Sequence, residues 1–281
     1  MRLHRSSELR LFLDELGIDA KKGLSQNFLI DGNILRKIIK AADIHPKDYV
    51  IEIGPGPGAL TEFLLEFDAH VTAIEIDPNF ASALKRLQTQ GRSLTIFQQD
   101  FLKFPLEEYL EKIPKKVKVV ANLPYHITTP ILTKLLAMHD KIESVTIMVQ
   151  KEFAKRMTAA PGSSDYGSFT VFAAFYSNPS YCFTVEPTCF YPRPKVQSAI
   201  VHCQLRTPPL SDTAESFFIL TRTAFQKKRK MLKTSLKDLF PAPSVEQALA
   251  DMGISPQARP EELSLQQFLA LFEKLRPQRI S

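Results

Sequence analysis

The sequence of 281 residues has only three cysteines, and none of them lie at the Cys-x-x-Cys spacing of zinc sites. An odd number of thiols cannot all pair, so we expect neither a disulfide scaffold nor a metal site, and a reducing cytoplasmic location fits. No apolar run approaches the roughly 18 residues that a membrane span requires. Residues 1–17 alternate charge with leucine and lack the apolar core of a secretory signal, so no membrane association is expected.

Acidic residues are absent from Arg222 to Lys237, although this stretch contains seven basic residues. The whole chain has a net charge of only +6, and its 44% hydrophobic content is typical of a globular protein with a substantial core. A local basic stripe is typical of a surface that binds nucleic acid. A solvated helix face would give the same pattern, so the charge run alone leaves both interpretations open.

The first 150 residues alternate short apolar runs with segments of helical periodicity. Strands are predicted at 49–54, 70–76, 93–97, 117–121 and 144–149, and helices at 59–67, 79–87 and 128–138. This alternation is typical of a parallel, doubly wound α/β sheet with both faces covered.

The pattern changes in the last third of the chain. Two extended segments, 181–185 and 196–205, flank a proline-rich loop and are expected to pair at the edge of the sheet. Helices are predicted after the Pro-Pro linker at 208–209, over 214–226, 230–240, 244–253 and 263–275. We therefore predict an α/β domain over 1–205 and a small helical domain over 206–281.

A glycine-rich loop, Gly54–Gly58 (GPGPG), follows the first predicted strand. Glycines at the carboxyl end of such a strand let backbone approach a nucleotide closely. However, Pro55 and Pro57 remove two N–H donors that a pyrophosphate would need. The loop therefore favours a nucleoside ligand without phosphates, such as S-adenosylmethionine, although a plain tight turn has similar residues.

Two acidic side chains follow the next two strands. Glu75 ends the second strand and can accept both hydroxyls of a ribose, with Asp77 as the alternative. Asp100 follows the third strand, where it can accept a hydrogen bond from an adenine amine or cap a helix.

Asn122-Leu123-Pro124-Tyr125 follows the fourth strand and is the sharpest motif. The Asn122 side-chain oxygen and the Pro124 carbonyl can accept the two hydrogens of an exocyclic amine, while Tyr125 stacks on the base. Two acceptors aim the nitrogen lone pair at a methyl donor, so positioning supplies most of the acceleration and no charged base is needed. An asparagine-capped turn beside a core tyrosine is the structural alternative.

Four motifs occur in order: residues 22–29 (KGLSQNFL), the glycine loop, residues 122–130 (NLPYHITTP) and residues 190–198 (FYPRPKVQS). Together they resemble the rRNA adenine N6,N6-dimethyltransferase family, specifically the bacterial small-subunit type linked to kasugamycin resistance. His126 departs from the asparagine expected after the tyrosine.

The resemblance implies a Rossmann-like fold that binds S-adenosylmethionine and dimethylates two adjacent adenosines in a hairpin near the 3′ end of small-subunit (16S) rRNA. It implies cofactor contacts from Asn27, Leu29, Gly54, Glu75, Asp100 and Asn122. The implied target-base pocket consists of Asn122, Leu123, Pro124, Tyr125 and Phe190. RNA contacts are expected from Arg193, Lys195, Lys227, Lys228, Arg229 and Lys230. The expected partner is the immature small ribosomal subunit, and a monomer is expected.

Three other classes of protein share some of these features. A macrolide-resistance type methyltransferase would act on large-subunit rRNA, and residues 190–198 with the helical tail argue against it. A non-catalytic ribosome-assembly or transcription factor would keep the basic surface and lose the pocket. An NAD oxidoreductase is disfavoured by the Gly-x-Gly-x-Gly spacing and the two prolines.

Overall fold

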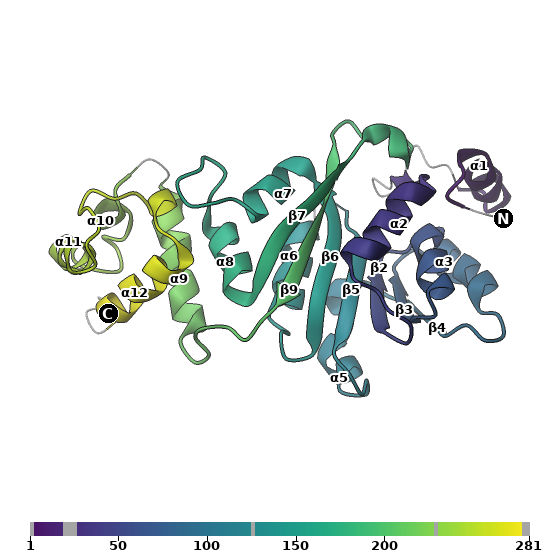
Figure 1. Cartoon of the computed structure of the whole chain (residues 1–281), viewed down its shortest axis with the longest axis horizontal. Helices are drawn as coiled ribbons and strands as arrows, with labels where there is room; N and C mark the ends of the chain where they lie inside the picture. The colour runs from purple at the N-terminus through teal and green to yellow at the C-terminus, as the bar shows by residue number, and fades with distance from the viewer. Residues whose placement is uncertain (1–2, 19–26, 125–126, 228–229, 277–281) are drawn as a thin grey trace. The chain divides into compact units, whose positions relative to one another are not determined.

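A computed structural model describes residues 3–18, 27–124, 127–227 and 230–276 of the chain (Figure 1). The chain forms two compact units, one of residues 1–154 with 178–206 and the other of residues 155–177 with 207–281. Within the described ranges, no helix is long and apolar enough to cross a membrane.

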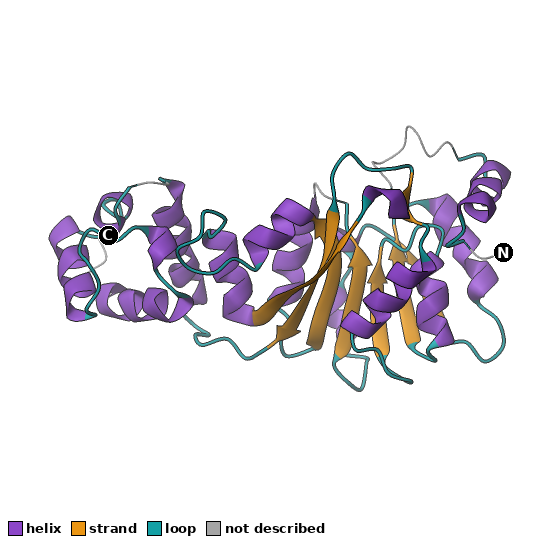
Figure 2. Cartoon of the chain, turned by 45° about the horizontal axis from the view of Figure 1, so that its top comes forward, coloured by secondary structure: helices purple, strands orange, loops and turns teal. Residues whose placement is uncertain are grey.

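The first unit contains a seven-stranded sheet in the order β4-β3-β2-β5-β6-β9-β7, drawn in orange in Figure 2. Strands β2 to β6 pair in parallel with one another, and β9 pairs antiparallel with β6. The strands are β2 (Tyr49–Ile53), β3 (His70–Glu75), β4 (Leu94–Gln98), β5 (Val117–Asn122), β6 (Ile142–Gln150), β7 (Ser177–Val185) and β9 (Ser198–Leu205). A separate antiparallel pair joins β1 (Phe28–Leu29) to β8 (Phe190–Tyr191).

Helices connect the parallel strands and bury the apolar side chains of the sheet. Leu35 and Ile38 of α2, with Leu64 of α3, belong to one buried cluster with Val50 and Val71 of the sheet. The helices of this unit are α1 (Ser6–Glu15), α2 (Gly32–Ala41), α3 (Ala59–Glu66), α4 (Pro78–Leu84), α5 (Leu106–Leu110) and α6 (Thr128–Leu136), and α7 (Lys151–Met157) spans the boundary. Short 3₁₀ turns are η1 (Lys85–Leu87), η2 (Phe101–Lys103) and η4 (Pro187–Cys189).

The second unit is helical and has an aromatic core. The rings of Phe175 and Phe217 stack with centroids 5.3 Å apart, and Phe272 meets Phe217 edge-on. Its elements are α8 (Ser168–Tyr176), α9 (Ala214–Gln226), α10 (Leu232–Ser235), α11 (Ala242–Asp251), the 3₁₀ turn η5 (Pro260–Glu262) and α12 (Leu265–Leu275).

The predicted α/β fold with a helical tail is confirmed, while two details differ. Residues 155–177 belong to the second unit, because Phe175 of α8 packs on Phe217 of the tail, whereas the predicted boundary assigns them to the first. The helix predicted over 230–240 ends at Ser235. Leu236 and Phe240 are nevertheless buried, because turns after Ser235 carry them into the core.

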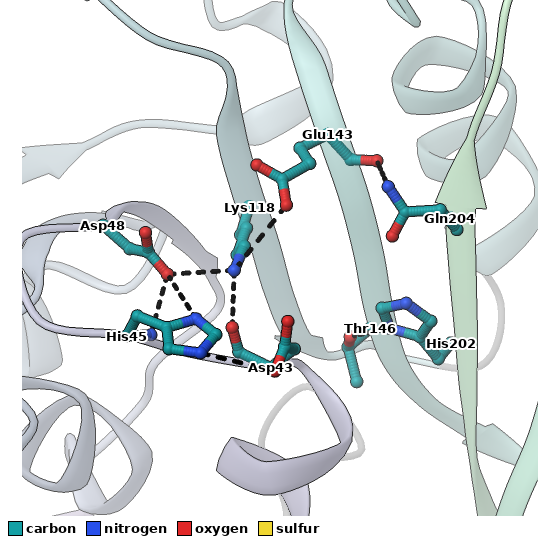
Figure 3. A network of polar contacts seen from close by, with 8 residues as sticks. All are labelled: Asp43, His45, Asp48, Lys118, Glu143, Thr146, His202 and Gln204. Atoms are coloured by element: carbon teal, nitrogen blue, oxygen red, sulfur yellow. Dashed lines mark hydrogen bonds and ion pairs between the residues drawn. The ribbon is translucent and has the colours of Figure 1, made fainter.

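A polar network surrounds Lys118, near the amino end of β5 (Figure 3). Lys118 is 5% exposed, and its ammonium group donates to the carbonyl oxygen of Asp43. The same nitrogen lies 3.0 Å from Asp48 Oδ2 and 3.7 Å from Glu143 Oε1. Its charge is thus matched by groups of the protein itself.

Candidate cofactor and base site

The strand order reverses between β2 and β5, and a cavity of about 290 Å³ lies at the carboxyl ends of these strands. Ligands of doubly wound sheets bind at this reversal, because the loops that follow the two strands diverge there. The cavity brings together every residue expected to contact the cofactor: Asn27, Leu29, Gly54, Glu75, Asp100 and Asn122.

The glycine loop forms one wall of this cavity. Its three glycines have φ values of 64°, 54° and 90°, a region that other residues rarely adopt. A Cβ atom on Gly58 would lie 2.5 Å from Leu84 Cδ2, so this position also requires a residue without a side chain. On the far side of the loop, Arg86 donates a 2.7 Å hydrogen bond to the Pro57 carbonyl.

Glu75 and Asp77 have separate roles in the structure. The Glu75 carboxylate accepts 2.8 Å and 2.9 Å hydrogen bonds from the backbone N–H groups of Gly56 and Asp77, and burial raises the pKa of Glu75. Asp77 instead caps α4 by accepting from the Asn79 N–H at 2.8 Å. Glu75, which lines the cavity, is therefore the candidate ribose acceptor.

Asp100 both caps a turn and lines the cavity. Its Oδ1 atom accepts a 2.9 Å hydrogen bond from the Leu102 N–H at the start of η2. Two apolar side chains of the cavity wall, Ile76 and Leu102, are 56% and 37% exposed. Apolar surfaces beside carboxylates suit a nucleoside, because its base is flat and apolar and its edges carry hydrogen-bond donors.

Asn122 is oriented by the chain itself. Its Nδ2 atom donates a 3.2 Å hydrogen bond to the Asn27 carbonyl, which leaves Oδ1 as the acceptor on the other side of the planar amide. The Pro124 carbonyl already accepts from Ile127 N and Thr128 Oγ1, both at 3.2 Å. An incoming amine would have to displace one of these donors, which the sequence pattern could not indicate.

The remaining predicted site residues are divided between the cavity wall and positions outside it. Phe190 is 2% exposed, pairs with Leu29 across β1 and β8, and is not part of the cavity wall. Its ring belongs to the buried core cluster of the first unit, and stacking of Phe190 on the target base stays a prediction. Leu123 and Pro124 line the cavity, and Arg193 and Lys195 are exposed outside it. Tyr125, His126, Lys228 and Arg229 lie outside the described residues.

Glu52 is a cavity residue that the sequence analysis missed. The side chain is 2% exposed, and its Oε2 atom has no hydrogen-bond partner among the described residues. Burial, with a smaller contribution from the charge of Glu75, raises the pKa of Glu52 to about 8. A carboxyl group in the apolar strand YVIEI, directly before the glycine loop, was the available signal.

The fold is that of a doubly wound α/β protein, with a cavity at the reversal of strand order that is a candidate nucleoside site. The ribosomal RNA adenine dimethylase family matches residues 17–276. The small-subunit rRNA methyltransferase A of Protochlamydia amoebophila is 55% identical over 98% of both chains, and that of Chlamydia muridarum is 48% identical over 96% of this chain and 97% of its own. The chain belongs to the ribosomal RNA adenine dimethylase family.

Two solved structures share the fold. A dimethyladenosine transferase from Plasmodium falciparum is 28% identical, with a TM-score of 0.77 over 90% of this chain and 100% of its own. The 23S rRNA methyltransferase ErmE is 32% identical, with a TM-score of 0.70 over 89% of this chain and 100% of its own.

Proposed function

We propose that the protein transfers methyl groups from S-adenosylmethionine to N6 of two adjacent adenosines, in a hairpin near the 3′ end of small-subunit rRNA. One observation carries the proposal: a chain of this family places Glu75, Asp100 and Asn122 around a single cavity at the reversal of strand order.

The residues of the cavity fit S-adenosylmethionine. Glu75 can accept the ribose hydroxyls and Asp100 the adenine amine, with Ile76 and Leu102 against the base. The unpartnered carboxyl oxygen of Glu52 offers an acceptor for an ammonium group. Bound there, S-adenosylmethionine would supply an electrophilic methyl group.

Catalysis by this chain is mainly positioning. The lone pair of adenine N6 is delocalised into the ring, so the amine is a weak nucleophile. Asn122 Oδ1 accepts one amine hydrogen, and the bond from Asn122 Nδ2 to Asn27 fixes the direction of that acceptor before the substrate arrives. Tyr125 is proposed to stack on the base. A loop adenosine leaves its stack at low cost, so the pocket selects unpaired RNA.

The RNA surface is proposed to include Arg193 and Lys195 of the first unit and the basic stripe of the second. Lys230 is exposed, whereas Lys227 lies 3.9 Å from Asp238 in an exposed ion pair that is worth little. The stripe, including Lys228 and Arg229, would bind phosphates of the immature small subunit. We further propose that the protein acts as a monomer in the cytoplasm.

Large-subunit rRNA is the second candidate substrate, because a 23S rRNA methyltransferase shares the fold at 32% identity. The greater identity, 55%, to a small-subunit enzyme favours the small subunit.

The test is transfer of isotope-labelled methyl groups to under-methylated small subunits, with large subunits in parallel and the product nucleoside identified by mass spectrometry. We expect dimethyladenosine in small-subunit rRNA alone, and its loss with Asn122→Ala. Label in the large subunit would support the second candidate. No label in either, with cofactor and subunits still bound, would indicate an assembly factor.

A further inference from the structure

Lys134 of α6 reaches the turn that follows Asp100. Its ammonium group donates to the carbonyl oxygens of Phe101, Leu102 and Phe104, at 3.1, 3.1 and 2.7 Å. The nitrogen also lies 5.2 Å from the centroid of the Phe101 ring. A lysine has three N–H donors, so all of them can be used on this one turn.

The turn held by Lys134 carries two groups of the cofactor cavity. The Leu102 N–H orients the Asp100 carboxylate, and the Leu102 side chain forms part of the cavity wall. The Lys103 N–H also bonds to the Asp100 carbonyl, so the turn and Asp100 form one hydrogen-bonded piece. A change in the position of the turn would therefore move the Asp100 acceptor.

The other end of α6 begins at the target-base motif. Thr128, the first residue of the helix, donates its hydroxyl to the Pro124 carbonyl, two residues after Asn122. Lys134 thus connects the segment that holds the target amine to the turn that holds the adenine of the cofactor. Burial lowers the pKa of Lys134, and the negative charge of the nearby Asp100 partly offsets this lowering.

We propose that Lys134 is a positioning residue that locks the Asp100 turn to α6 and thereby sets the preference of the cavity for the 6-amino group of the cofactor's adenine. The inference rests on the proposed contact between Asp100 and that amine. Lys134 itself contacts backbone carbonyls and does not need to touch the ligand.

The test compares the binding of two ligands that differ at the edge of the base formed by positions 1 and 6. S-adenosylhomocysteine carries an amine at position 6, and S-inosylhomocysteine carries an oxygen there together with a hydrogen on N1. Dissociation constants are measured by calorimetry for the whole protein and for Lys134→Met, Lys134→Gln and Lys134→Arg. Lys103→Met is the matched control, because Lys103 is an exposed lysine in the same turn.

We expect the preference for the adenosyl ligand to fall about tenfold in Lys134→Met, the scale of one hydrogen bond to a charged group. Lys134→Gln retains two donors and should lose less, Lys134→Arg should restore most of the preference, and Lys103→Met should match the unmodified protein. In methyl transfer, the KM for S-adenosylmethionine should rise in Lys134→Met while kcat changes by less than about twofold.

Two results would overturn the inference while the proposed adenine contact stands. One is an unchanged preference in both Lys134→Met and Lys134→Gln, and the other is an equal loss of affinity for both ligands, as a purely structural role predicts. Asp100→Ala separates the two proposals. If Asp100→Ala leaves the preference unchanged, the adenine contact proposed for Asp100 is wrong, and the role of Lys134 falls with it.

Discussion

The polar side chains at the two ends of strand β5 differ in whether the protein itself supplies their partners. Near the amino end, the buried ammonium of Lys118 is surrounded by Asp48, Glu143 and a backbone carbonyl. At the carboxyl end, Asn122 lines a cavity together with Glu52, whose Oε2 atom has no partner among the described residues. The polar groups at the amino end are paired within the protein, whereas those at the carboxyl end include oxygen atoms that can accept hydrogen bonds from a ligand.

Because polar groups are matched at one end of the strand and unmatched at the other, the two ends should contribute to stability and to ligand binding, respectively. Removing one partner of a buried, matched charge is costly for folding. A buried polar atom without a partner costs stability in the absence of ligand, and binding recovers that cost. Substitutions at the two ends should therefore change different measurements.

Asn122→Ala should impair the catalytic function of the carboxyl end of β5. Loss of the oriented acceptor should reduce the methyl-transfer rate roughly 10²- to 10³-fold, as for other groups that act in the transition state. Because the Asn122 side chain makes a single hydrogen bond among the described residues, the Tm should change little. Single-turnover rates and thermal melts measure both quantities, and a fall in Tm that accounts for the lost rate would contradict this role.

Lys118→Met should destabilise the fold at the amino end of β5. Two carboxylates would lose their shared cation, and we expect the free energy of unfolding to fall by about 2–4 kcal/mol. The rate per folded molecule should be unchanged. Denaturant unfolding is the measurement, with Lys47→Met as the control, since the ion pair of Lys47 with Asp68 is exposed and should contribute less than about 1 kcal/mol.

Glu52→Gln should remove the pH dependence of cofactor binding at the carboxyl end of the sheet. The pKa of Glu52 is about 8, so the group is protonated at pH 6 and must release its proton to bind a cation. The affinity for S-adenosylmethionine should rise by up to about tenfold from pH 6 to pH 7. This rise should disappear in Glu52→Gln and persist in Glu66→Gln, an exposed control on α3. Equal pH dependence in all three proteins would refute the role.

The same group should affect the stability of the cofactor-free protein. The pKa of Glu52 in the folded state, about 8, lies above its ordinary value of 4.5, so the folded state binds more protons than the unfolded state between these values. Stability from this group is greatest below pH 4.5 and is lost as the pH rises through about 8. Glu52→Gln should therefore raise the Tm more at pH 8 than at pH 5.

The smallest effect is expected in the second unit, where the same contrast between matched and unmatched charges occurs. Lys233 pairs with Glu246, whereas Lys230 is exposed. Lys230→Gln should weaken small-subunit binding about two- to threefold and reduce the salt dependence by the equivalent of about one phosphate contact. Lys233→Gln should leave the salt dependence unchanged, and binding across a salt series tests both.

Much of the cavity lining was predictable because the carboxyl ends of parallel strands meet at one edge of a sheet. Gly54, Glu75, Asp100 and Asn122 follow four strands, and all of them line the cavity. Phe190 could not be placed in this way. It lies on the short strand β8, whose pairing with β1 joins residues about 160 positions apart and buries its ring.

By itself, the sequence determined the α/β alternation, the tight glycine loop and the order of the acceptors along the chain, because these depend on local periodicity and backbone stereochemistry. The tertiary structure decided which polar groups are matched. Asp77 became a helix cap. Among the described residues, Glu52 Oε2 was left without a hydrogen-bond partner, and the Lys134 ammonium reached three carbonyls 30 to 33 residues before it. Burial and hydrogen bonding between distant segments set these outcomes, and no local pattern of residues contains them.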